Sequence, residues 1–203
     1  MATKSKTSLR GIQIGFTHLL IVGVLLLIGI ASRFLLIDYP NFKPIAAIAI
    51  FCGFYFSRMW IGLAAAAGIM LISDLAIGFY DWPVMISVYG SILVACVFGR
   101  QLIGWMEEKR LFGKLMGLSV AALLASAVFF LLTNSAVVIA GWYPISVDGF
   151  VSSFAAGLPF FKYTLFGNLL FTVGIFAMYE VLSAVLRSTF QISNFESEIT
   201  TTS

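Results

Sequence analysis

The chain has 203 residues, of which 61% are hydrophobic and only 10% are charged, and its formal net charge is +3. A water-soluble domain of this size needs far more charged side chains to cover its surface, so the composition excludes an ordinary soluble fold. It also lacks the basic soluble face that nucleic-acid binding requires, so no nucleic-acid partner is expected.

The apolar residues gather in stretches that predict transmembrane helices. A helix that crosses the hydrocarbon core of about 30 Å needs about 20 mostly apolar residues. The candidate stretches lie at about 15–37, 44–57, 59–79, 84–103, 115–140 and 159–186, and the second is short for a full span. We therefore expect an all-α fold, a polytopic membrane bundle of about six transmembrane helices embedded in a lipid bilayer.

The chain divides into one membrane domain and two polar ends. Residues 15–187 form the expected transmembrane domain, and residues 1–14, which contain Lys4, Lys6 and Arg10, form a short N-terminal segment. Residues 188–203 are rich in Ser and Thr and are expected to be a disordered tail. A basic start before an apolar run also fits a cleaved signal peptide, although this run is long for one.

The distribution of basic residues predicts the orientation of the helices. Cytoplasmic loops collect Lys and Arg. If the N-terminus is inside, the outer loops carry only Lys43 and Lys162, and the inner segments carry the following basic residues: Lys4, Lys6, Arg10, Arg58, Arg100, Lys109, Arg110, Lys114 and Arg187. Both termini are therefore expected in the cytoplasm.

The sequence contains no motif of a familiar enzyme or metal site. It has no G-x-S-x-G, Walker A, H-E-x-x-H or C-x-x-C pattern, and His18 is its single histidine. Cys52 and Cys96 both lie in apolar stretches and are expected to be small core residues. We therefore expect no catalytic residue, no cofactor, no metal site and no enzymatic activity.

Polar side chains inside the apolar stretches are the informative residues. A charge at membrane depth is costly and normally faces the interior of the bundle. With the predicted topology, these side chains and several aromatic ones converge on the outer half of the membrane, as a pocket with apolar walls and a few polar groups would require. The candidate substrate-binding residues are Arg33, Asn41, Lys43, Asp74, Trp82, Tyr89, Asn134, Phe160, Lys162, Tyr163 and Asn168.

Each type of side chain has an expected role. Arg33, Lys43 and Lys162 would meet an anionic group of the ligand, and Asp74 would orient Arg33 or accept a hydrogen bond from a ligand amine. The amides of Asn134 and Asn168 would supply hydrogen bonds. The aromatic rings of Trp82, Phe160 and Tyr163 would stack on a ring of the ligand. The expected ligand is therefore a small anionic or zwitterionic molecule.

Simpler interpretations of the same residues remain open. Arg33 and Asp74 could be only a buried pair that holds two helices together. Lys43 and Lys162 could extend to the membrane surface without binding anything. Glu180, near the inner end of the last stretch, could pair with Arg100 or Arg58.

Two further patterns concern helix packing. Apolar residues at helical spacing predict a short surface helix over 147–154, before a sixth membrane helix that starts at Pro159. This short helix could be a packed loop or a lid over the pocket. The small residues Ala46, Ala49 and Gly53 allow close backbone approach, either inside the bundle or against another subunit.

Several segments resemble an uncharacterised family of small bacterial membrane proteins described as transport proteins. The segments are Arg33-Phe34, Tyr39-Pro40-Asn41-Phe42-Lys43-Pro44-Ile45-Ala46-Ala47, Ser73-Asp74-Leu75, Leu132-Thr133-Asn134 and Leu158-Pro159-Phe160-Phe161-Lys162-Tyr163-Thr164. The whole layout is also similar to the substrate-binding S components of energy-coupling-factor (ECF) transporters.

This resemblance implies a substrate-binding subunit in the bacterial cytoplasmic (inner) membrane. It would take up a vitamin or similar micronutrient from an outward pocket, together with a transmembrane coupling subunit and ATPases. The alternative is a non-catalytic structural or accessory subunit of a larger membrane complex. An intramembrane enzyme acting on lipid is the least favoured class, because the acid–base and metal constellations are missing.

Overall fold

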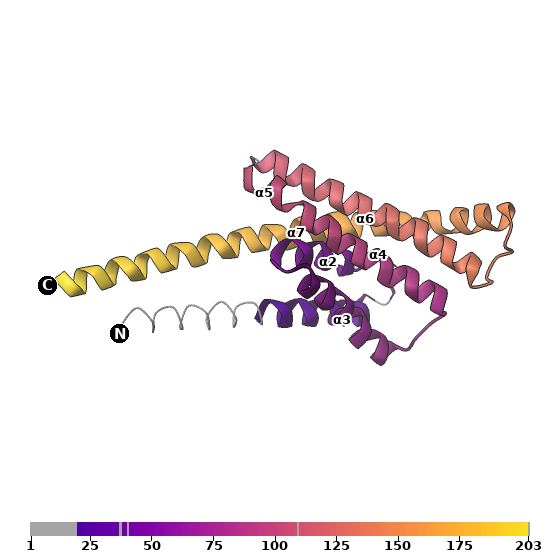
Figure 1. Ribbon diagram of the computed structural model, residues 1–203, viewed down its shortest axis with the longest axis horizontal. Helices are drawn as coiled ribbons and strands as arrows, with labels where there is room; N and C mark the ends of the chain where they lie inside the picture. The colour runs from indigo at the N-terminus through magenta and orange to yellow at the C-terminus, as the bar shows by residue number, and fades with distance from the viewer. Residues whose placement is uncertain (1–19, 37, 40, 109, 203) are drawn as a thin grey trace.

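The computed structural model describes the backbone of residues 20–36, 38–39, 41–108 and 110–202, and their side chains apart from those of 105, 107–108 and 186–202. All regular secondary structure in this part of the chain is helical (Figure 1). The elements are a first helix Leu20–Leu35, then α2 Ile45–Tyr55, α3 Met59–Ile77, α4 Trp82–Gln101, α5 Ile103–Glu108, α6 Leu111–Ile139 and α7 Val147–Thr202. The expected all-α class is therefore confirmed.

Four of these helices, rather than the expected six, are long and apolar enough to cross a membrane. They are α3, α4, α6 and the Val147–Val185 part of α7. The first helix is shorter over its described length, and the start of the expected 15–37 stretch, like the 1–14 segment, lies outside the described residues. The helix α2 has 11 residues, or about 17 Å at 1.5 Å per residue, well short of the hydrocarbon thickness.

The short helix α2 is the centre of the bundle. Pro44 stands at its N-cap and Phe56 ends it in an extended conformation. Every residue from Ala47 to Gly53 is buried. A Cβ atom on Gly53 would overlap the carbonyl of Cys96, and one on Gly99 would overlap the carbonyl of Ile50. Small residues thus let α2 and α4 approach backbone to backbone, so internal packing explains the small-residue spacing in α2.

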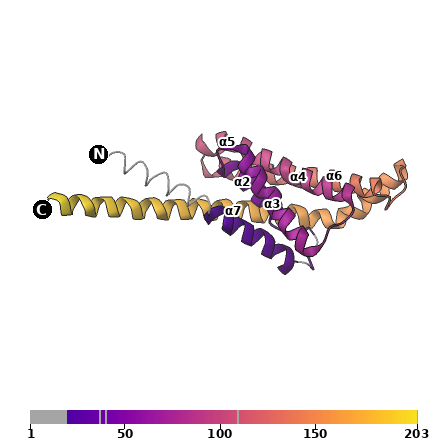
Figure 2. The same ribbon diagram turned by 60° about the horizontal axis from the view of Figure 1, so that its bottom comes forward.

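The last helix is continuous where the sequence predicts two helices. Helix α7 begins at Val147 and contains Pro159 in its interior, so the predicted boundary at Pro159 is wrong. Proline removes one backbone hydrogen bond, which transmembrane helices can tolerate. The helical backbone extends through Thr202, across the segment for which composition predicts disorder, and it projects past the other helices in both views (Figures 1 and 2).

The first helix lies along the α3 side of the bundle (Figure 2). Gly29 makes this packing close, because an added Cβ atom would lie 2.6 Å from Cγ2 of Ile69. Four residues beyond Gly29, Arg33 therefore lies beside α3 near the end of the bundle that carries the 36–44 and 78–81 connections. This placement sets up the polar network described next.

Candidate ligand-binding site

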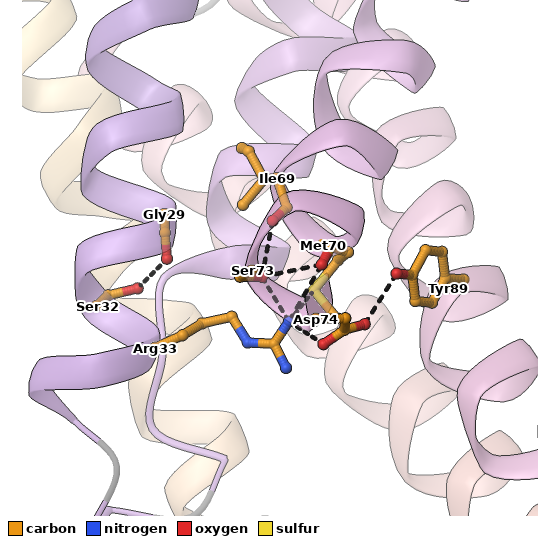
Figure 3. A network of polar contacts seen from close by, with 8 residues as sticks. All are labelled: Gly29, Ser32, Arg33, Ile69, Met70, Ser73, Asp74 and Tyr89. Atoms are coloured by element: carbon orange, nitrogen blue, oxygen red, sulfur yellow. Dashed lines mark hydrogen bonds and ion pairs between the residues drawn. The ribbon is translucent and has the colours of Figure 1, made fainter. Parts of the chain in front are cut away.

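A charged network joins the first helix, α3 and α4 (Figure 3). Arg33 Nη1 lies 2.6 Å from Asp74 Oδ1 and donates a hydrogen bond of 2.6 Å to Ser73 Oγ. The hydroxyl group of Tyr89 donates a hydrogen bond of 2.8 Å to Asp74 Oδ2. The side chain of Asp74 is 0% exposed and that of Arg33 is 13% exposed. A carboxylate buried this deeply needs its charge paired, and Arg33 provides the pairing.

Arg33 uses only one of its three guanidinium nitrogens in these contacts. All of its hydrogen bonds and its ion pair within the described residues come from Nη1. In Figure 3 the second terminal nitrogen points away from Asp74, and no dashed line reaches it. A guanidinium has five N–H donors in a planar fork, so one edge of Arg33 remains available for another acceptor.

A cavity of about 210 Å³ adjoins this network. Its walls come from the first helix, the connection after it, the 78–81 connection and helices α2, α3, α4, α6 and α7. The lining residues are Arg33, Asn41, Lys43, Ile45, Ala46, Met70, Tyr80, Val88, Ile92, Phe129, Thr164 and Asn168. Apolar walls with a few polar groups are typical of small-molecule sites, and this volume is below the usual range for drug-sized ligands.

The connection between the first helix and α2 is fixed against α7. Asn41 has φ 62°, a left-handed conformation that asparagine tolerates better than most residues. Next to it, the ring of Phe42 packs on Phe171 with centroids 5.2 Å apart, and Gly167 leaves room for the Phe42 backbone. The turn and this packing hold Asn41 and Lys43 at the cavity wall.

Lys43 is a half-buried cation without an acidic partner among the described residues. Burial lowers the pKa of its ammonium below the usual 10.5, and the positive charge of Arg33 lowers it further. No acidic residue of the described part of the chain lines the cavity. The lining therefore carries two cations, of which only Arg33 is paired.

Asn168 closes the cavity from α7. This residue is 3% exposed, and its Nδ2 donates a hydrogen bond of 2.8 Å to Ser126 Oγ on α6. Ser126 in turn donates to the carbonyl of Ala122 at 2.8 Å. This chain fixes the orientation of the amide, and Asn168 Oδ1 accepts no hydrogen bond from the described residues. The cavity therefore has an available acceptor on its α7 wall.

Comparison with known proteins places the chain in a family. Residues 14–191 match the family described as "Family of unknown function (DUF6580)". The chain belongs to DUF6580. No curated protein matches it, and no solved structure matches it. The expected membership of an uncharacterised family is thereby confirmed, whereas the similarity to ECF S components stays a prediction.

In this DUF6580 protein, the cavity brings together four of the residues singled out from the sequence: Arg33, Asn41, Lys43 and Asn168. Asp74 and Tyr89 lie behind the wall and act on it through Arg33. The expected pairing of Arg33 with Asp74 is present, and Arg33 also faces the cavity. Arg33 can therefore both hold two helices together through Asp74 and contact a ligand in the cavity.

The remaining predicted site residues lie away from this cavity. Trp82, Phe160 and Tyr163 are exposed, and Lys162 Nζ lies 5.0 Å from the centroid of the Tyr163 ring. Asn134 lies in the contact between α6 and α7. The Asn134 side-chain Nδ2 donates a hydrogen bond of 2.8 Å to the backbone carbonyl of Phe130. The backbone carbonyl of Asn134 accepts a hydrogen bond of 2.7 Å from Ser153 Oγ.

Several lining residues of the DUF6580 cavity have no strong signature in the sequence. Tyr80 lies in the connection before α4; burial raises the pKa of its hydroxyl to about 12, with a further contribution from the charge of Asp74. Thr164 and Asn168 are four residues apart on α7, as are Val88 and Ile92 on α4. This spacing puts each pair on one helix face and is the available sequence signal.

A second ion pair lies at the opposite end of the bundle. Lys114 Nζ is 2.8 Å from Glu180 Oε1, and the pair joins α6 to α7. The expected partners of Glu180 were Arg100 or Arg58, so that prediction is wrong. Arg100 Nη1 instead donates to the carbonyl of Phe56 at 3.4 Å. Both side chains of the Lys114–Glu180 pair are partly exposed, so its contribution to stability is small.

Proposed function

We propose that this DUF6580 protein is a substrate-binding integral membrane subunit of a small-molecule uptake transporter. The observation that carries the proposal is the cavity, because Arg33, a mostly buried cation with unused donors, forms part of its wall. A group this costly to bury is typical of substrate paths in membrane proteins. The proposed substrate is a vitamin or micronutrient-like molecule small enough for a cavity of about 210 Å³.

The cavity opens toward the outer side in the proposed topology. It lies at the end of the bundle that carries the 36–44 and 78–81 connections, which the distribution of basic residues assigns to the outside. The protein is then a multi-pass protein of the bacterial cytoplasmic membrane with both termini in the cytoplasm. The sequence has no Walker A motif, so any ATP dependence comes from partners, such as the coupling subunit and ATPases of S-component systems.

A cavity-filling variant tests this proposal. Ala46 lines the cavity, and Ala46→Phe places a ring inside it. Ala64, on the exposed surface of α3, gives the matched control Ala64→Phe. The purified proteins are compared by native mass spectrometry, followed by extraction of any bound small molecule. We expect a retained molecule in the wild type and in Ala64→Phe, and its loss in Ala46→Phe.

The opposite result has a distinct meaning. If the wild type retains no small molecule and is isolated with other membrane proteins in fixed stoichiometry, the substrate-binding function is wrong. The chain is then a structural or accessory subunit of a larger complex. Size-exclusion profiles of both variants distinguish loss of binding from loss of folding.

A further inference from the structure

The charge of the cavity lining narrows the class of ligand. Asp74 uses both carboxylate oxygens within the network, since Oδ1 faces Arg33 and Oδ2 accepts from Tyr89. It compensates the charge of Arg33 and leaves that of Lys43 uncompensated. Among the residues that the structure describes, no acidic side chain lines the cavity itself. A part-buried cation without a partner favours a ligand that brings one negative charge.

The start of α2 adds to this preference. Ile45 and Ala46 line the cavity and form the first turn of α2. Pro44 at the N-cap supplies no side-chain acceptor, and the first turn contains no acidic residue. The first backbone N–H groups of a helix have no acceptor within it, and they carry the positive end of the helix dipole. An anion beside Lys43 would therefore also meet this end of α2.

The same lining excludes a ligand that is cationic within the cavity. A buried ammonium group needs a carboxylate to balance its charge. Asp74 is 0% exposed, and its Oδ1 is already ion-paired with Arg33 while its Oδ2 accepts a hydrogen bond from Tyr89. Apolar residues such as Val88, Ile92 and Phe129 form much of the remaining lining, and its other polar residues, Asn41, Tyr80 and Thr164, carry no negative charge. On the α7 wall, Asn168 offers a carbonyl oxygen to a hydrogen-bond donor.

From these observations, and resting on the proposed function, we infer that the ligand is a small monocarboxylate with a compact apolar body. Its carboxylate binds between Lys43, the unused edge of Arg33 and the start of α2. A donor group at the other end of the ligand binds Asn168. Cationic ligands are excluded, and a zwitterion is disfavoured because its ammonium group would lack a carboxylate partner. An aromatic ring fits, since an apolar cavity of about 150 Å³ holds benzene and this one has about 210 Å³.

A panel of matched probes tests the charge preference. Benzoate, benzamide and benzylamine share one ring and differ in charge, and 4-hydroxybenzoate adds a donor. Binding to the full-length protein in nanodiscs is measured by isothermal titration calorimetry after removal of any retained molecule. We expect benzoate to bind at least about tenfold more tightly than benzamide, because charge-assisted hydrogen bonds are the stronger ones. We expect no binding of benzylamine and the tightest binding for 4-hydroxybenzoate.

Two lysine variants locate the carboxylate. Lys43→Gln should weaken benzoate binding about tenfold or more and leave benzamide binding unchanged. Lys162→Gln removes an exposed lysine on α7 that does not line the cavity. This variant should therefore change neither benzoate binding nor benzamide binding. Circular dichroism and size-exclusion profiles confirm that both variants are folded.

The failures of the two proposals are distinguishable. If benzamide or benzylamine binds as tightly as benzoate, or if Lys43→Gln has no effect, the monocarboxylate inference is wrong. If none of the probes binds, the inference is also wrong. In each case the proposed function still stands when Ala46→Phe removes a molecule that the wild type retains.

Discussion

Arg33 Nη1 lies 2.6 Å from Asp74 Oδ1, and this contact joins the first helix to α3 at the wall of the cavity. Asp74 is fully buried, and Tyr89 holds its other oxygen from α4. Nη1 of Arg33 therefore makes the contacts that join the helices, while the other guanidinium nitrogens are available to a ligand in the cavity. The pair is a structural element and a component of the candidate site at once.

The energetic coupling within this pair is measurable. Removing one partner leaves a buried charge without compensation, which costs about 3–5 kcal/mol, whereas removing both costs much less. We expect Arg33→Met and Asp74→Leu to destabilise the protein strongly and the double variant to recover much of the loss. The measurement is reversible unfolding in mixed micelles, arranged as a double-mutant cycle. Additive effects of the two substitutions would show that the charges are not coupled.

Two glycines of the same helix should respond in opposite directions to alanine. On α4, a Cβ atom at Gly99 would overlap the backbone of Ile50, whereas one at Gly90 meets nothing within 4 Å. Gly99→Ala should therefore destabilise the protein by about 1–3 kcal/mol or more through overpacking. Gly90→Ala should stabilise it by about 0.5–1 kcal/mol, because glycine in a helix loses more backbone entropy. Thermal unfolding in detergent compares the two, and equal effects would contradict the packing of α2 against α4.

Carboxylate binding should weaken at high pH. The protonated form of Lys43 binds the anion, so affinity falls as pH rises through its pKa. Burial and the charge of Arg33 lower that pKa below 10.5, so the fall should begin at a lower pH than for an exposed lysine. Calorimetric titrations with benzoate at increasing pH measure the profile. Lys43→Arg keeps its charge over this range and should remove the fall; an unchanged profile in this variant would assign the titration to another group.

The orientation in the membrane can be tested at the two ends of α6. Phe112 near its start and Ile145 in the connection after it are each 80% exposed. Cys52 and Cys96 are buried, so they should give little background labelling. With the cytoplasmic termini proposed, a membrane-impermeant maleimide should label Ile145→Cys in intact cells and Phe112→Cys only after permeabilisation. The reverse pattern would invert the topology and place the cavity on the inner side.

The composition and local patterns of the sequence were sufficient for the class of protein. Long apolar stretches with few charges predict membrane helices because burial of apolar groups and backbone hydrogen bonding are local requirements of a bilayer. The same reasoning identified Arg33 and Asp74, because charges in apolar stretches must find partners. The apolar stretch expected at 44–57 also begins at the N-cap of α2, Pro44.

Only the tertiary structure decided which of the predicted site residues share a cavity. Membrane helices are apolar on every side, since lipid and protein interior are equally apolar, so periodicity does not say which face is inward. Asn134 and Asn168 look alike in the sequence, yet the backbone carbonyl of Asn134 accepts a hydrogen bond from the Ser153 side chain on α7, while Asn168 lines the cavity. The full burial of α2 and the continuity of α7 through Pro159 depend in the same way on neighbouring helices, which no local segment encodes.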